Sequence, residues 1–436
     1  MDRSENHVPV TLERLTQEEL LALARELNDT YGQFREAGLA LDLTRGKPSP
    51  SQLALADTLD TGDAGTGGFI ATDGTDTRNY GGPDGLAEAR ALGAELLGVR
   101  PDEVIAGGNS SLTLMYLYLL NAWLYGPAGP GSAWHDGGTT RFLCPVPGYD
   151  RHFAILEDLG IDMVNVRMTV DGPDMDEVES LVRDDPTVKG LWCVPKYSNP
   201  GGQIYSDATV ERLSRLGTIA GPHFRVLCDN AYAVHDLDDT PQELENIMDA
   251  CRAQGTDDSL VLFASTSKIT RAGAGISFVA GSPVNLKAFR SRLRTLTIGP
   301  DKITQLRHVR FLRDLDGVRA HMRKHAAILR PKFDLVQRRL SEALDGKGMG
   351  RWSAPRGGYF VSFDALPGLA GQIISLAEDA GVKLTPAGAT FPYGRDPDDT
   401  NIRLAPTFPD LGDLDQALRV FTVCVQLATV TQRLSG

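Results

Sequence analysis

Apolar residues follow a helical spacing near the start of the chain. Leucines recur three or four residues apart over residues 11–38, which predicts an amphipathic helix. Residues 41–74 are instead rich in Gly, Pro, Ser and Thr, and this composition predicts an extended arm rather than packed core. The first 74 residues are therefore expected to form a helix and an arm that pack on the rest of the chain and on a partner subunit.

From residue 75 to residue 320 short apolar runs alternate with helical segments such as 207–216. Each run is four to six residues long and stops at a turn residue, as a buried strand does. The runs lie at 141–145, 190–195, 224–228 and 260–263. Buried strands separated by helices predict an α/β domain with a mostly parallel sheet, in which ligands bind at the carboxyl ends of the strands.

The pattern changes after residue 320. A long helical stretch (318–343) leads into the alternating run 357–363, and a helix (370–380) is followed by strands at 382–384 and 401–404. These elements predict a smaller α+β domain. The expected organisation is an N-terminal segment (1–74), a large domain (75–320) and a small C-terminal domain (321–436).

Composition narrows the possible functions. The 436 residues carry a net charge of −13, which opposes a nucleic-acid-binding role because phosphate-reading surfaces are basic. The apolar stretch 112–125 is too short for a membrane span, and the polar N-terminus does not resemble a secretory signal. Five scattered cysteines without a CxxC pair predict a reducing cytoplasm, and no metal site is expected.

Lys268 follows an apolar strand end and is flanked by Ser265 and Ser267. A lysine in this setting suits an amine that is desolvated to act as a nucleophile, although a solvated loop lysine is the common alternative. Asp229 and Tyr232 follow another strand end. A buried carboxylate there can keep the pyridine nitrogen of pyridoxal phosphate (PLP) protonated, while a capping aspartate is the simpler explanation of Asp229 alone.

Further polar residues follow other strand ends. Asn199 opens the turn Asn-Pro-Gly-Gly and could donate to the ring oxygen of PLP, although such turns are common. Tyr149 could stack on the pyridine face, or could be an aromatic residue that lines a loop. Arg403, between two apolar residues, could pair with a substrate carboxylate through both arms of its guanidinium, or could be a surface arginine.

A glycine-rich turn opens an apolar helix at residues 107–112. Free amides and hydroxyls at a helix N-terminus bind phosphate, although a simple cap is the commoner explanation. The candidate phosphate ligands are Asn109, Ser110 and Ser111, with the hydroxyls of Ser265 and Ser267 in addition.

Together these residues resemble the fold-type-I PLP aminotransferases of class I, in particular the actinobacterial aspartate aminotransferase-like branch. The resemblance covers nearly the whole chain. The matching stretches are 43–48, 79–82, 107–111, 144–153, 199–202, 229–232, 265–268 and 401–406.

The resemblance implies a role for each matching residue. Lys268 binds PLP covalently and moves the proton during catalysis, and Asp229 pairs with the ring nitrogen. Asn199 and Tyr232 bind the ring oxygen. Tyr149 stacks on the ring. Arg403 takes the substrate α-carboxylate with help from the amide of Gly46. Tyr80 reaches the phosphate in the other subunit, so that a homodimer with shared sites is implied.

One departure from the family pattern concerns the phosphate. Most class I enzymes have an arginine about two turns after the lysine, whereas residues 271–277 here read Arg-Ala-Gly-Ala-Gly-Ile-Ser. We therefore expect Arg271 or the serine cluster to bind the phosphate.

The reaction expected from the resemblance is ping-pong transamination between aspartate or glutamate and 2-oxoglutarate or oxaloacetate. An acidic side chain needs a second cation, for which Arg151 is the first candidate because it lies two residues from Tyr149. Arg45, Lys47 and Arg294 are weaker candidates. Transamination of aromatic, 2-aminoadipate or specialised-metabolite amino acids, or PLP-dependent β-elimination, are the alternatives. A transcription regulator is not expected, because only one helix precedes the arm.

Overall fold

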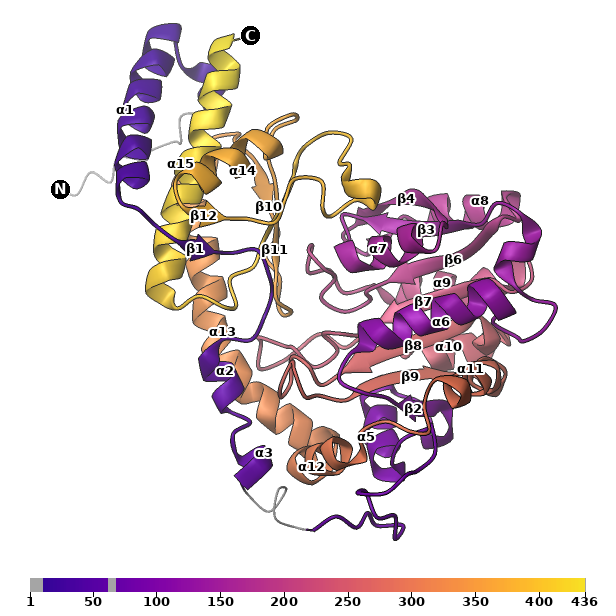
Figure 1. Ribbon diagram of the computed structural model, residues 1–436. Helices are drawn as coiled ribbons and strands as arrows, with labels where there is room; N and C mark the ends of the chain where they lie inside the picture. Colours follow the sequence, from indigo (N-terminus) through magenta and orange to yellow (C-terminus); the bar gives the residue numbers. More distant parts are fainter. Residues whose placement is uncertain (1–10, 62–67, 436) are drawn as a thin grey trace.

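The computed structural model describes residues 11–61 and 68–435 (Figure 1). Its largest sheet has eight strands in the order β2-β9-β8-β7-β6-β3-β4-β5. The pairs β8/β7, β7/β6, β6/β3 and β3/β4 are parallel, and β9 and β5 pair antiparallel to their neighbours. The bounds are β2 Val104–Ala106, β3 Arg141–Val146, β4 Asp162–Thr169, β5 Gly172–Pro173, β6 Val188–Cys193, β7 Arg225–Asp229, β8 Leu260–Ser265 and β9 Ser277–Gly281.

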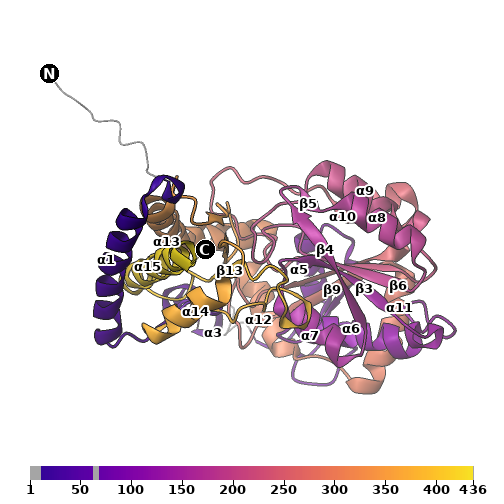
Figure 2. The same ribbon diagram turned by 90° about the horizontal axis from the view of Figure 1, so that it is seen from above.

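Helices cover both faces of this sheet (Figure 2). Successive residues of a strand point to opposite faces, so Leu227 joins one hydrophobic core while Val226 and Cys228 join the other. The four predicted strands are all present in this sheet, and its burial on both faces explains their continuous apolar runs. One core includes α6 (Ser111–Tyr125), α7 (Asp150–Asp158) and α11 (Pro283–Leu296). The other includes α5 (Ala87–Leu97), α8 (Met175–Asp184), α9 (Asp207–Ile219), α10 (Ile247–Gln254) and α12 (Lys302–Leu312).

A second unit is built on a three-stranded antiparallel sheet in the order β10-β11-β13. Its own core includes α1, which packs along α15 (Figure 1). The bounds are α1 Gln17–Glu36, α13 Leu315–Leu344, β10 Arg351–Trp352, β11 Val361–Asp364, α14 Ala370–Asp379, β12 Val382–Lys383, β13 Asn401–Leu404 and α15 Leu411–Ser435. Helix α13 runs through residue 320, so the predicted domain boundary there stays a prediction.

The arm differs from the extended segment that its composition predicts. Strand β1 (Leu41–Asp42) pairs in parallel with β12, and two short helices follow, α2 (Pro50–Ala54) and α3 (Thr58–Thr61). Ser49 and Gln52 form a capping box around Pro50, which explains why a helix begins in this Ser- and Pro-rich segment. Gln52 is fully buried, so the arm contributes packed residues. The predicted arm residues 62–67 lie outside the described residues.

The strand predicted at 357–363 is also shorter than expected, because β11 begins only at Val361. Gly358 has a φ of +79°, which a continuous strand does not allow, and a Cβ on Gly357 would lie 2.3 Å from the Tyr197 ring. The two glycines therefore form a tight turn against Tyr197. Within the described ranges, no helix is both long and apolar enough to cross a membrane.

Candidate active site

The predicted site residues of the large sheet converge because they follow parallel strands. Asn199 comes after β6, Asp229 ends β7 and Lys268 lies in the turn after β8. Parallel strands end at the same edge of a sheet, and here that edge faces the β10-β11-β13 sheet (Figure 1). Arg403 of β13 meets Asn199 across this junction, so both units contribute to one site.

The amine of Lys268 lies among aromatic rings. Its Nζ is 4.8 Å from the centroid of the Tyr232 ring and 5.8 Å from that of Tyr359. Lys268 is partly buried, whereas Tyr232 and Tyr359 are 3% and 1% exposed. The predicted loop lysine is therefore directed inward, with its amine next to the face of Tyr232.

Asp229 is buried and binds a histidine that sequence reasoning missed. His152 Nε2 donates to Asp229 Oδ2 at 3.2 Å, and the His152 ring stacks on Trp192 at a centroid distance of 4.0 Å. The other carboxylate oxygen, Oδ1, is buried and has no partner among the described residues. An unpaired buried oxygen lowers the stability of the fold, so we expect a bound molecule to donate a hydrogen bond to Asp229 Oδ1.

Tyr149 and Tyr232 are neutral phenols. Burial raises the pKa of Tyr149 to about 12, and a nearby Lys268 opposes this shift. Burial and the neighbouring Asp229 raise the pKa of Tyr232 above its ordinary value. Both hydroxyls therefore keep their protons and can donate hydrogen bonds. Tyr149 lies edge-on to His152, with ring centroids 5.0 Å apart.

Arg403 is 5% exposed and held from one side. Its Nη1 donates to Asp150 Oδ1 at 3.0 Å and to Asn199 Oδ1 at 3.4 Å, and its Cζ lies 4.9 Å from the centroid of the Phe360 ring. The Nε atom is buried and finds no partner in the part of the chain that the structure describes. The edge formed by Nε and Nη2 can therefore receive a carboxylate through two parallel hydrogen bonds. Asp150 was not expected here.

The predicted phosphate ligands meet at the N-terminus of α6. Ser267 Oγ donates to the carbonyl of Asn109 at 2.8 Å, which joins the turn after β8 to the glycine-rich turn. Ser110 is the N-cap of α6, and Ser111 is its first residue. Ser265 Oγ accepts from the amide of Ser267 at 3.4 Å. The serine cluster and a helix N-terminus thus form one surface, the arrangement that suits a phosphate.

Arg271 contacts the arm and not the serine cluster. Its guanidinium pairs with Asp60 of α3 and donates to the carbonyl of Ala56 at 3.1 Å. Both partners belong to the arm, more than 200 residues away in the sequence, so the sequence around Arg271 does not predict these contacts. Phosphate binding by Arg271 stays a prediction, and the serine cluster is the better placed of the two candidates.

Three further residues predicted for the site differ in how buried they are. Gly46 lies against Phe360, because a Cβ at this position would be 2.5 Å from the ring. Arg151 is half exposed, and its Nε is 3.8 Å from Asp150 Oδ2. Tyr80 is 79% exposed on the surface. The weaker cation candidates are also on the surface, where Arg45 and Arg294 are exposed and Lys47 lies over the Phe408 ring at 3.7 Å.

These residues fit PLP. Asp229 Oδ1 is a buried acceptor for which residues 11–61 and 68–435 supply no donor, as the protonated nitrogen of a pyridine ring would require. Lys268 supplies an amine, Tyr232 a neutral hydroxyl, and the N-terminus of α6 free amides near Ser267. The arrangement offers a partner for each functional group of the cofactor.

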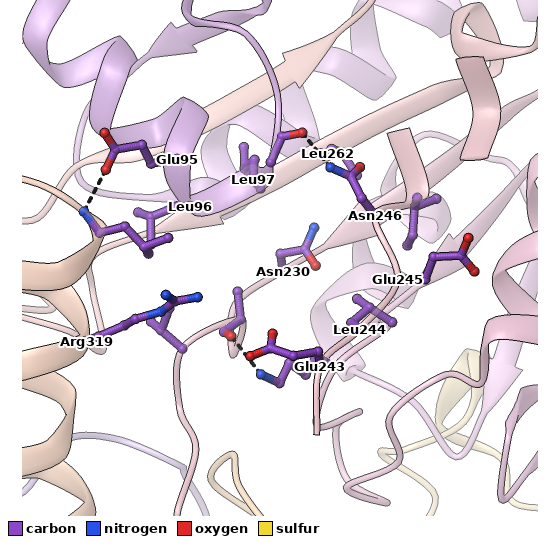
Figure 3. Close-up of a pocket in the computed structure, with 16 residues that line it drawn as sticks. Glu95, Leu96, Leu97, Asn230, Glu243, Leu244, Glu245, Asn246, Leu262 and Arg319 are labelled. Atoms are coloured by element: carbon purple, nitrogen blue, oxygen red, sulfur yellow. Dashed lines mark hydrogen bonds between the residues drawn. The ribbon is translucent and has the colours of Figure 1, made fainter. Parts of the chain in front are cut away.

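A separate hollow of about 210 Å³ lies between residues of α5, the segment after β7 and α13 (Figure 3). Asn230, the residue after Asp229, lines it together with Glu243 and Arg319, and Lys268 and Arg403 are not part of its lining.

Comparison with known proteins identifies relatives along nearly the whole chain. The family model described as "Aspartate amino-transferase" matches residues 15–436. A Mycolicibacterium smegmatis protein described as an aminotransferase is 46% identical over 98% of this chain and 100% of its own length. The aspartate aminotransferase of Corynebacterium glutamicum is 44% identical over 96% of both chains. The solved structure of an aspartate transaminase from the same organism covers 97% of this chain and 99% of its own, with 43% identity and a TM-score of 0.93.

Proposed function

The chain belongs to the aspartate amino-transferase family and is a PLP-dependent aminotransferase, and on that premise we propose that it transfers an amino group between an acidic L-amino acid and a 2-oxo acid. The substrates proposed are aspartate or glutamate with 2-oxoglutarate or oxaloacetate, in a ping-pong cycle. The name of the Corynebacterium glutamicum relative supports this choice. The observation that carries the proposal is a pair of buried atoms, Asp229 Oδ1 and Arg403 Nε, that have no hydrogen-bond partner among the residues that the structure describes.

We assign the cofactor-binding roles from these contacts. PLP, when bound, supplies an aldehyde that takes the amino group and a ring that accepts electrons from the substrate Cα. With PLP bound, Asp229 Oδ1 would accept a hydrogen bond from the protonated ring nitrogen, while His152 donates to Oδ2 at 3.2 Å and orients the carboxylate. Tyr232 would donate a hydrogen bond to the ring oxygen of PLP, because its raised pKa keeps the hydroxyl proton in place.

Lys268 has two roles in the proposal. Its amine would hold the cofactor covalently in the resting enzyme, and as a free amine it would move the proton from the substrate Cα as a general acid and base. The aromatic rings of Tyr232 and Tyr359 lie beside Nζ, with centroids 4.8 and 5.8 Å away, and border the space in which the amine acts. The seryl hydroxyls and the N-terminus of α6 take the phosphate.

Arg403 orients the substrate rather than reacting. Asp150 and Asn199 occupy Nη1, so the open edge of the guanidinium faces the α-carboxylate. A carboxylate fixed at two points cannot rotate, and the Cα–H bond is then presented to Lys268. Arg151 is proposed to bind the side-chain carboxylate of the substrate. To do so, its guanidinium must move away from Asp150, whose Oδ2 lies 3.8 Å from Nε.

The test is to supply amino acids singly to the PLP-loaded enzyme and to follow the absorbance of the lysine-bound cofactor. Aspartate and glutamate are expected to bleach it, and a 2-oxo acid to restore it. A response confined to aromatic amino acids or 2-aminoadipate would select the alternative transaminase. Pyruvate and ammonia formed without an acceptor would select β-elimination.

We also propose a homodimer with shared sites, in which Tyr80 reaches the phosphate of the partner subunit. The 79% exposure of the Tyr80 side chain, together with the exposed Phe69 and Ile70, supports a surface that another copy covers. Mixing inactive Tyr80→Ala and Lys268→Ala subunits tests this. Shared sites restore activity, because one site of the mixed dimer then contains both residues, whereas a Tyr80 that acts in its own subunit restores none.

The cytoplasm is the proposed location. All five cysteines are buried and unpaired, which agrees with a reducing compartment. Fractionation of the cells that make the protein tests this.

A further inference from the structure

Four of the eight histidines of the chain gather behind the turn that carries Lys268, and the proposed catalytic cycle uses none of them. All four are buried, with exposed fractions of 5% or less. They come from the segment after β7, from α12 and from α13. The four are His235, His308, His321 and His325.

The turn itself leaves two carbonyl groups unpaired by backbone. The amides of Ile269 and Thr270 both donate to the carbonyl of Thr266, at 2.9 and 2.8 Å, as in a helical turn. The chain does not continue as a helix, so no described backbone amide reaches the carbonyls of Lys268 and Ile269. Buried carbonyls need donors, and here side chains must supply them.

Three side chains do so. His235 Nε2 lies 3.3 Å and the Tyr359 hydroxyl 3.4 Å from the carbonyl oxygen of Lys268. His321 Nε2 lies 2.9 Å from the carbonyl oxygen of Ile269. A carbonyl oxygen only accepts, so both histidines carry a proton on Nε2.

Burial keeps these histidines uncharged. Burial and the nearby Lys268 lower the pKa of His235 to about 3. Burial also lowers the pKa of His321, against the opposing effect of the Ile269 carbonyl. Neutral donors can satisfy the carbonyls without placing a positive charge of their own beside the Lys268 amine.

The second layer of this network comes from the arm. Gln52 Oε1 accepts from the amide of Ser49 at 3.0 Å, which fixes the orientation of the side-chain amide. Its nitrogen then donates to His325 Nδ1 at 3.1 Å and to the Tyr359 hydroxyl at 3.0 Å. Gln52 belongs to α2, which contacts α13, and its side chain is fully buried.

We propose that Gln52, Tyr359 and three of these histidines form a positioning network that fixes the backbone carbonyls of Lys268 and Ile269. The three are His235, His321 and His325, the last of which lies 3.2 Å from His321 between their Nε2 atoms. By fixing the turn, the network aims the Lys268 amine, so α2 of the arm is part of the framework of the active site. The expected effect on catalysis rests on the proposed role of Lys268. The expected rigidity of the turn does not depend on that role.

Gln52→Leu is the direct test, since leucine has a similar volume and no donor. Leu53→Ala is the matched control, because Leu53 is an exposed residue of the same helix. Hydrogen–deuterium exchange of the amides of 266–270 is measured in the protein without PLP, and kcat and KM in the loaded enzyme. Tyr359→Phe, which removes a single hydroxyl, serves as the second variant if Gln52→Leu fails to fold.

We expect exchange in this turn to rise at least tenfold in Gln52→Leu and not in Leu53→Ala. We also expect kcat to fall about 10- to 100-fold while KM for the amino acid changes less than threefold, because misplacing a reacting group lowers kcat and Arg403 is untouched. Unchanged exchange in both Gln52→Leu and Tyr359→Phe would overturn the network. Faster exchange with unchanged kcat would overturn the claim that it aims Lys268, and absence of PLP attachment to Lys268 in the unmodified chain would instead contradict the proposed function.

Discussion

Replacing Arg403 with lysine tests how the substrate is held. The charge remains, but an ammonium cannot present two parallel N–H groups along one edge, as Nε and Nη2 of Arg403 do. Since Asp150 and Asn199 already take Nη1, this open edge is the part of the guanidinium left for a carboxylate.

The expected loss follows from one charge-assisted hydrogen bond. Such a bond contributes roughly 1.5–3 kcal/mol, which corresponds to about a 10- to 150-fold change in an equilibrium constant. We therefore expect kcat/KM for aspartate to fall by about that factor in Arg403→Lys. Most of the fall should be in KM, because the carboxylate is bound in both the ground state and the transition state.

Steady-state kinetics with varied aspartate provide the assay. Arg338→Lys is the control variant, since Arg338 is an exposed arginine of α13. An amine substrate without an α-carboxylate should react equally slowly with the wild-type enzyme and with Arg403→Lys. A KM for aspartate within threefold of the wild-type value would refute the assignment of Arg403 to the α-carboxylate.

Three further predictions concern neighbouring residues. His152→Phe keeps an aromatic ring on Trp192 but removes the donor to Asp229, so PLP should bind about tenfold more weakly. A fluorescence titration with PLP measures this affinity, and an unchanged value would contradict the role of His152. Gly46→Ala places a Cβ 2.5 Å from the Phe360 ring, which should lower the free energy of unfolding by about 1–3 kcal/mol in a urea titration, and an unchanged midpoint would contradict this packing. Burial lowers the pKa of His325 from 6.5 to about 4, so the unfolded chain binds more protons between those values. Stability should therefore fall as pH falls below 6.5, by about 2 kcal/mol at pH 5 from His325 alone, and a His325→Phe variant should lose that part of the pH dependence.

The sequence predicted the strand ends well, for a local reason. Apolar runs buried on both faces of a sheet stop where polar residues begin, so the order of residues along the chain is enough to place Asp229 and Lys268 at one edge. Arg403 was identified in the same way, from its two apolar neighbours in a short strand.

The missed residues depend on contacts between distant parts of the chain. His152 and Asp229 are 77 residues apart, and Asp150 and Arg403 are 253 apart. No local pattern reports such pairs, since a histidine or aspartate in the first turn of a helix has many ordinary uses. The buried helix α2 was missed because Ser and Pro also favour loops, and only packing against α13 distinguishes the two cases.

The most direct test of the central claim is borohydride reduction of the protein loaded with PLP, followed by mass spectrometry of its peptides. We predict a reduced phosphopyridoxyl group on the peptide that contains Lys268, and its loss in a Lys268→Ala variant. Modification of another lysine, or a protein that stays colourless and unmodified with PLP, would contradict the account.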